Sequence, residues 1–278
     1  MALVKLMLFY FKKNDIISYK GCVIMDIKEK NNIMYAIIIY LGILFFIASF
    51  IMIGISLIIC FKDNLNFVEL YTSFAATDFS EFPPQIIKAN AITQAYSNLI
   101  AYLISTVLVV VFLRKYLVED FNKIKDSKFK FILYSIGAGI LFIVISYGID
   151  FALSYFVDSS QNQQNIEMIM SNGGKIPMVI SVVLLAPVVE ELIYRKAIFK
   201  LTENGNIKKS YIISIVAFTL PHMISTSGNI LTWLLQCIPY AACGFMLCYI
   251  YEKSNKNTYA VIIAHMMNNL LAAILMFM

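Results

Sequence analysis

Two adjacent carboxylates, Glu190 and Glu191, follow an apolar stretch that carries no charge from Ile176 to Val189. Such a stretch can enter a bilayer, where a carboxylate costs roughly 2.5–3.5 kcal/mol on insertion scales. An ionisable residue at that depth is by default a functional residue with a polar partner. The pair therefore predicts a buried site, and polar residues in the other apolar stretches are the candidates for its remaining members.

The histidines of the chain are the first of these candidates. Both of them, His222 and His265, fall inside apolar stretches. One histidine in a membrane helix can be a packing residue, but two beside an intramembrane carboxylate pair indicate a shared polar site. Asn269 follows His265 by four residues and shares its helical face, as Phe218 shares the face of His222.

The spacing around the carboxylates assigns them different roles. Glu191 precedes Arg195 by four residues, which is the favourable order for an ion pair on a helix. Adjacent residues differ by about 100° around a helix, so Glu190 and Glu191 cannot point the same way. We expect Glu191 to pair with Arg195 as a structural contact and Glu190 to face the interior of the bundle.

Two imidazoles, a carboxylate and a carboxamide suit the hydrolysis of a peptide bond. That reaction needs a base for water, a group that orients the water and donors for the oxyanion. Glu190 can be the base and His222 can hold the water, while His265 donates to the oxyanion together with a carboxamide. The candidate catalytic residues are Glu190, Glu191, His222, His265 and Asn269, supported by Arg195 and Phe218.

The composition identifies the kind of protein that must hold these residues. Of 278 residues, 60% are hydrophobic and 14% charged, and the mean hydropathy is +0.77. These values are typical of a polytopic membrane protein, so the predicted fold class is all-α, a transmembrane helical bundle. The net charge of +5 is then no sign of nucleic-acid binding. The expected partners are membrane lipids and a peptide or protein substrate at the membrane.

Seven apolar stretches are each near the ~20 residues that a helix needs to cross the hydrocarbon core. They lie at about 33–61, 91–113, 129–156, 176–198, 210–225, 230–251 and 258–277. The segments that connect these stretches are alternately basic and either acidic or neutral. Cytoplasmic loops of membrane proteins carry the excess of Lys and Arg. The pattern predicts about seven spans with the N-terminus in the cytoplasm and the C-terminus outside.

This topology divides the chain and places the site. The predicted parts are a cytoplasmic segment 1–32, three helices over 33–156 with an outer loop 62–90, and a four-helix core over 176–278; Met25 would also serve as a start. At ~1.5 Å per residue, Glu190, His222 and His265 lie roughly 12, 18 and 10 Å from the cytoplasmic side. We therefore expect a multi-pass plasma-membrane protein of a bacterium, with its site in the cytoplasmic half.

The spaced residues resemble the signature of a known family. Glu190-Glu191-x-x-x-Arg195, Phe218-x-x-x-His222 and His265-x-x-x-Asn269, in that order on separate spans, look like the three motifs of the CPBP family. That family groups CAAX prenyl endopeptidases of the Ras-converting type with bacteriocin-processing or self-immunity proteins of the Abi type. The resemblance covers about residues 176–275, roughly the last third of the chain.

The resemblance implies an intramembrane endopeptidase of the CAAX prenyl protease type. In the family pattern, the residues matching Glu190 and His222 activate water, and those matching His265 and Asn269 form the oxyanion site. Every position of the pattern is filled in this chain. The expected mechanism uses a glutamate and needs no cofactor, and the first three helices lie outside the resemblance.

Three alternatives compete with this interpretation. Glu190, His222 and His265 would also make a zinc site with an open position, although the chain has no HExxH motif. A non-enzymatic scaffold for bacteriocin self-immunity or signalling would keep the polar cluster for packing. A transporter or proton relay would use carboxylates and histidines too, but we find neither an inverted repeat nor a second helix with a buried carboxylate.

Overall fold

The computed structural model describes residues 18–19, 22–23, 25–76, 78–203, 206–226 and 228–276. These residues are almost entirely helical, which confirms the predicted all-α polytopic fold. Two short strands, β1 (Ser18–Tyr19) and β2 (Cys22–Val23), pair antiparallel ahead of the first helix. Most of the predicted segment 1–32 lies outside the described residues.

The first three predicted helices are present; the first two extend beyond their predicted bounds at both ends, whereas the third ends at Leu153, short of the predicted residue 156. They are α2 (Ile27–Gly42), η1 (Ile43–Ile47) and α3 (Ala48–Asp63) as one continuous helix, then α5 (Pro84–Ile124) and α6 (Lys128–Leu153). Asn64 ends the first helix in the left-handed conformation that suits a helix C-terminus. A short helix, α4 (Phe67–Ser73), lies in the predicted outer loop and is capped by the side chain of Asn66.

The fourth predicted helix is longer than its apolar core and is interrupted by π-helical turns. It consists of α7 (Gln161–Ile169), η2 (Met170–Gly174), α8 (Lys175–Val179), η3 (Ile180–Leu185), α9 (Ala186–Glu191), η4 (Leu192–Ile198) and α10 (Phe199–Thr202). We call residues 161–202 the motif helix. A kink divides it at Asn172 and Gly173, where the backbone leaves helical geometry and Gly173 has a φ of 101°.

Three further helices complete the bundle: α11 (Ile207–Met223), α12 (Ile230–Lys253) and α13 (Thr258–Leu275). Of the helices in the described ranges, six are long and apolar enough to span a membrane. The remaining predicted span, α11, has 17 residues and is about 26 Å long, somewhat less than the ~30 Å hydrocarbon core. The seven-span topology and the orientation of the termini therefore stay predictions.

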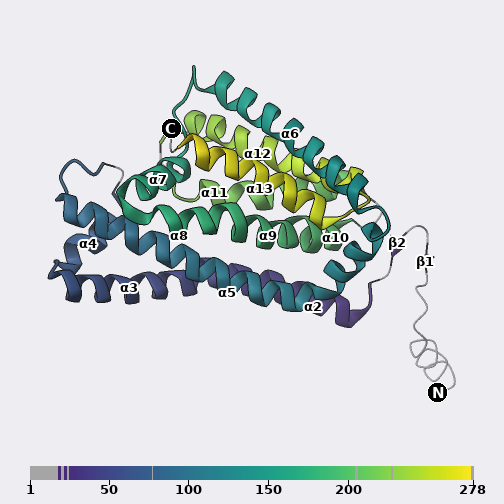
Figure 1. Cartoon of the computed structure of the whole chain (residues 1–278), viewed down its shortest axis with the longest axis horizontal. Helices are drawn as coiled ribbons and strands as arrows, with labels where there is room; N and C mark the ends of the chain where they lie inside the picture. The colour runs from purple at the N-terminus through teal and green to yellow at the C-terminus, as the bar shows by residue number, and fades with distance from the viewer. Residues whose placement is uncertain are drawn as a thin grey trace.

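The motif helix occupies the middle of the bundle (Figure 1). Helices α5 and α2 pack on one side of it, while α13 and α11 contact it from the other. This central position explains why 61% of its most apolar window is buried inside the protein, against 17–39% for the other candidate spans. The polar side chains of Glu190, Glu191, Arg195 and Lys196 on this helix are thus surrounded by protein, where they can find partners.

Candidate active site

The two carboxylates lie on α9, a single α-helical turn between two π-helical turns, η3 and η4. Glu190 is 4% exposed and Glu191 is fully buried. The backbone N–H of Ala186 bonds to the carbonyl of Ser181, five residues earlier, which is the π-helical pattern. Short π-helical segments are frequent at functional sites because they re-aim side chains without ending the helix.

Glu191 is the centre of a buried charge cluster. Its Oε1 accepts hydrogen bonds from Arg195 Nη1 at 3.2 Å and from His265 Nδ1 at 2.8 Å, and its Oε2 lies 3.2 Å from Arg195 Nε. Arg195 is fully buried and also donates to the backbone carbonyl of Gly244 at 3.3 Å. The predicted pairing of Glu191 with Arg195 is therefore present, and His265 joins it from α13.

The ring of Phe218 lies beside the side chains of Arg195, His222 and His265. The guanidinium carbon of Arg195 lies 4.6 Å from the centre of this ring, a cation–π contact. The same ring lies 4.8 Å from the ring of His222 and 6.0 Å from that of His265, measured between ring centres. Residues from the motif helix, α11 and α13 thus meet around one aromatic side chain, as the similar predicted depths require.

The hydrogen bonds of the two histidines assign a hydrogen to one nitrogen of each ring. His222 Nδ1 lies 2.8 Å from the carbonyl oxygen of Phe218, and His265 Nδ1 lies 2.8 Å from a carboxylate oxygen of Glu191. Carbonyl and carboxylate oxygens accept, so each Nδ1 donates and each Nε2 is the remaining nitrogen. The ring of His222 also packs against Tyr240 of α12, with 4.8 Å between ring centres.

Asn269 has a partner that the sequence did not indicate. Its side-chain amide donates to the backbone carbonyl of Val182 at 2.8 Å. In an α-helix the N–H of Ala186 would use this carbonyl, but it bonds to Ser181 instead. In the π pattern the donor would be residue 187, which is a proline and has no N–H. Asn269 therefore satisfies a carbonyl that the backbone of the motif helix leaves free.

Glu190 points toward a different set of residues from its neighbour. Its Oε1 accepts a hydrogen bond of 3.2 Å from the hydroxyl of Tyr102, on α5. Within the described residues it makes no hydrogen bond to His222 or His265, so a direct Glu190–His222 contact is not part of this arrangement. No sequence signal marked Tyr102, which lies in an apolar helix far from the motifs.

The alternative zinc site is not assembled in the described part of the chain. No three side chains among its His, Cys, Asp and Glu residues are placed to hold a metal ion. His265 directs its Nδ1 to Glu191, and Glu190 is bonded to a tyrosine hydroxyl. We therefore derive no chemical step through a metal.

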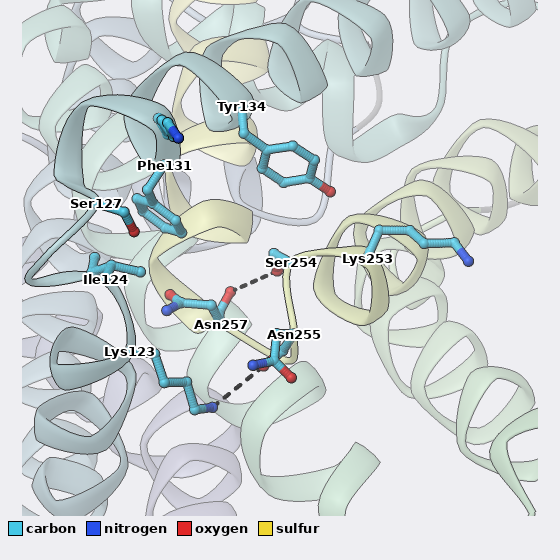
Figure 2. A pocket seen from close by; sticks show the side chains of 10 residues that line it. Lys123, Ile124, Ser127, Phe131, Tyr134, Lys253, Ser254, Asn255 and Asn257 are labelled. Carbon is cyan, nitrogen blue, oxygen red and sulfur yellow. Dashed lines mark hydrogen bonds between the residues drawn. The ribbon is translucent and has the colours of Figure 1, made fainter.

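A cavity of about 270 Å³ lies elsewhere, at one end of the bundle (Figure 2). The connection between α5 and α6 lines it together with the turn between α12 and α13, where Lys123 donates to the carbonyl of Asn255 at 3.4 Å. None of the predicted site residues lines this cavity. Its Lys123 is already paired with the buried carboxylate of Asp120, so the cavity offers no free cation at that position.

Comparisons with known proteins agree with the motif residues. The family model described as "Type II CAAX prenyl endopeptidase Rce1-like" matches residues 172–271, which include all seven predicted site residues. The chain is 30% identical over 186 residues to the Bacillus subtilis protein named "Putative membrane peptidase YdiL", and the match covers 66% of this chain and 72% of that protein. No solved structure matches the chain.

Proposed function

The chain belongs to the CPBP family of intramembrane proteases, and from this membership we propose that it is a glutamate-type endopeptidase. Its substrate is a membrane-associated protein or peptide, and a water activated by Glu190 cleaves one peptide bond. The observation that carries this proposal is the different pairing of two adjacent carboxylates: Glu191 is held by Arg195 and His265, whereas the one hydrogen bond that Glu190 accepts within the described residues comes from a tyrosine hydroxyl.

Glu190 is the base because its carboxylate keeps room for another proton donor. An ionised carboxylate has about four lone-pair sites, and the hydroxyl of Tyr102 occupies one of them. Glu191 is unsuited to the same task because a guanidinium and an imidazole already bind it. Glu190 therefore takes a proton from water, and the hydroxide equivalent attacks the carbonyl carbon of the scissile bond.

His222 orients this water. Its Nδ1 hydrogen is donated to the carbonyl of Phe218, so the Nε2 of the neutral ring has a lone pair free to accept from water. After the attack, the proton held by Glu190 moves to the nitrogen of the leaving amine as the C–N bond breaks. The carbonyl oxygen carries the negative charge between these steps and needs hydrogen-bond donors.

His265 and Asn269 supply these donors under one condition. The Nδ1 hydrogen of His265 is already donated to Glu191, so donation from Nε2 requires the doubly protonated imidazolium. The Glu191 carboxylate is the counter-ion within reach. Asn269 uses one amide hydrogen on Val182 and keeps the other for the oxyanion.

Cleavage of a reporter peptide library by the purified protein in detergent tests this function. Glu190→Gln removes the base at nearly constant size, and Glu119→Gln, on an exposed part of α5, is the matched control. We expect cleavage by the wild type and by the control, loss with Glu190→Gln, and no effect of a strong chelator.

Two results would contradict the proposal. Loss of cleavage with chelator, restored by added zinc, would establish the metal alternative. A membrane phenotype that survives Glu190→Gln, in a protein that cleaves no peptide of the library, would establish the scaffold alternative.

A further inference from the structure

Helix α5, which precedes the matched region, runs alongside the motif helix in the same direction (Figure 1). Successive positions on α5 contact successive positions on the motif helix. The contacts are Gln94 with Asn165, Asn98 with Met178, Thr106 with Leu185, and Asp120 with Lys196. The two helices therefore have a fixed relative register along most of their length.

A buried ion pair fixes this register most strongly. Both carboxylate oxygens of Asp120 accept from Lys196 Nζ, at 2.8 and 2.7 Å, and the two residues are 0% and 5% exposed. The backbone N–H and the hydroxyl of Thr258 donate to the same carboxylate at 2.9 and 2.8 Å. If one helix shifted along the other, Asp120 and Lys196 would separate. Either buried charge left without its partner would be strongly destabilising, so the pair fixes the register.

With the register fixed, α5 places Tyr102 beside Glu190. The hydroxyl of Tyr102 donates to Glu190 Oε1 at 3.2 Å, and no other hydrogen bond to this carboxylate occurs among the described residues. Two further tyrosines complete the surroundings: Tyr40 of α2 and Tyr194 of η4 lie with their hydroxyl oxygens 3.3 Å apart.

The chemistry of these neighbours suits a base. A cation in contact would hold the carboxylate as an ion pair, as Arg195 holds Glu191, and such a pair favours the charged form of a carboxylate. A phenol hydroxyl instead donates one neutral hydrogen bond, which orients the carboxylate and leaves its second oxygen available. Glu190 and Glu191 thus differ because Arg195 of the same helix and His265 of α13 contact Glu191, whereas α5 contacts Glu190.

We propose that Tyr102 is a positioning residue for this protease, and that its hydroxyl orients the Glu190 carboxylate so that Oε2 receives the proton of the attacking water. The inference rests on the proposed function of Glu190. It assigns a role to the N-terminal helices, because α5 supplies a hydrogen bond that the matched region 172–271 lacks on its own.

The test compares Tyr102→Phe with the wild type and with Tyr96→Phe, the same substitution at an exposed position of the same helix. A hydrogen bond to a charged group contributes enough that we expect kcat to fall about 10- to 100-fold in Tyr102→Phe, with KM unchanged. We also expect the acidic limb of the kcat profile to move to higher pH, since the anion loses a donor. Among the described residues, the titratable groups around Glu190 are Tyr40, Tyr102 and Tyr194, with the Glu191–Arg195 pair beside it and His222, which the proposed function places on the same water.

A second variant keeps the test valid if Tyr102→Phe does not fold. Fluorotyrosine at position 102 retains the ring and the donor but makes the hydroxyl more acidic, so the acidic limb should move to lower pH. If kcat and the acidic limb stay at wild-type values in the folded variants while Glu190→Gln is inactive, the role of Tyr102 is overturned and the proposed function stands. If Glu190→Gln cleaves normally, the proposed function itself is wrong.

Discussion

The side-chain amide of Asn269 donates to the backbone carbonyl of Val182, across the interface between α13 and the motif helix, at 2.8 Å. This carbonyl is free because a π-helical turn shifts one donor away from it and Pro187 lacks the other. Asn269 therefore has a structural task in addition to the catalytic one proposed for it. The two tasks can be separated by mutation.

We expect Asn269→Ala to destabilise the protein by about 1 kcal/mol, because the half-buried carbonyl of Val182 is left without a hydrogen bond. Pro187→Ala restores an N–H that can reach the carbonyl of Val182. In the Pro187→Ala background, Asn269→Ala should therefore cost less, with a coupling of about 0.5 kcal/mol or more between the two sites. Thermal unfolding of the four proteins in detergent measures this cycle, and additive effects would contradict the pairing. Cleavage should stay low in both proteins that carry Asn269→Ala because the oxyanion donor is absent.

The charge cluster around Glu191 makes a different prediction for stability. Arg195→Met leaves the Glu191 carboxylate buried with only His265 as a partner, and breaking a buried ion pair costs about 3–5 kcal/mol. The double variant Glu191→Leu/Arg195→Met removes both charges, so it should be more stable than Arg195→Met alone. Thermal unfolding compares the two. If the double variant were less stable than Arg195→Met, the two side chains would stabilise the protein through contacts other than their charge interaction.

The oxyanion role proposed for His265 predicts how two replacements differ. His265→Gln keeps a neutral amide donor, so reduced cleavage should remain, whereas His265→Ala removes the donor and should abolish cleavage. Measurement of kcat for the wild type and both variants decides this. Equal kcat values in His265→Gln and His265→Ala would contradict the role.

The packing of α5 against the kink of the motif helix predicts a strong effect of one methyl group. A Cβ at Gly174 would lie 2.7 Å from the Cβ of Ala95 and 2.9 Å from the backbone oxygen of Ala91, so the helices would have to separate. Gly174→Ala should therefore destabilise by about 1–3 kcal/mol. Gly148→Ala is the control, because nothing lies within 4 Å of its Cβ and alanine favours a helix by about 0.5–1 kcal/mol. Equal unfolding temperatures for the two variants would contradict the close approach.

The sequence predicted the helices and the motif residues for a clear physical reason. Apolar length defines a membrane helix, and a charge or histidine inside one stands out against it. The spacing of Glu191 and Arg195 was enough to predict their contact because it depends only on local helical geometry. The meeting of His222 and His265 around Phe218 followed from their similar depths.

The parts that could not be predicted depend on the packing of distant segments. Tyr102 is one of 17 tyrosines, and nothing in its neighbourhood marks it as the partner of Glu190. The π-helical turns also leave no simple signal, although Pro187 points to a free carbonyl in this stretch. The donor to that carbonyl, Asn269, could be identified only once α13 was placed.

The register between α5 and the motif helix bears on how such a protein can change in evolution. A gene segment encoding only residues 172–271 would carry every recognisable motif residue but leave Lys196 without Asp120 and Glu190 without Tyr102. Recombination that exchanged this segment alone would combine it with an α5 helix from another protein, whose residues were not selected to contact it. The unit that keeps these contacts together therefore extends upstream to include α5, beyond the region 172–271 that the family model matches.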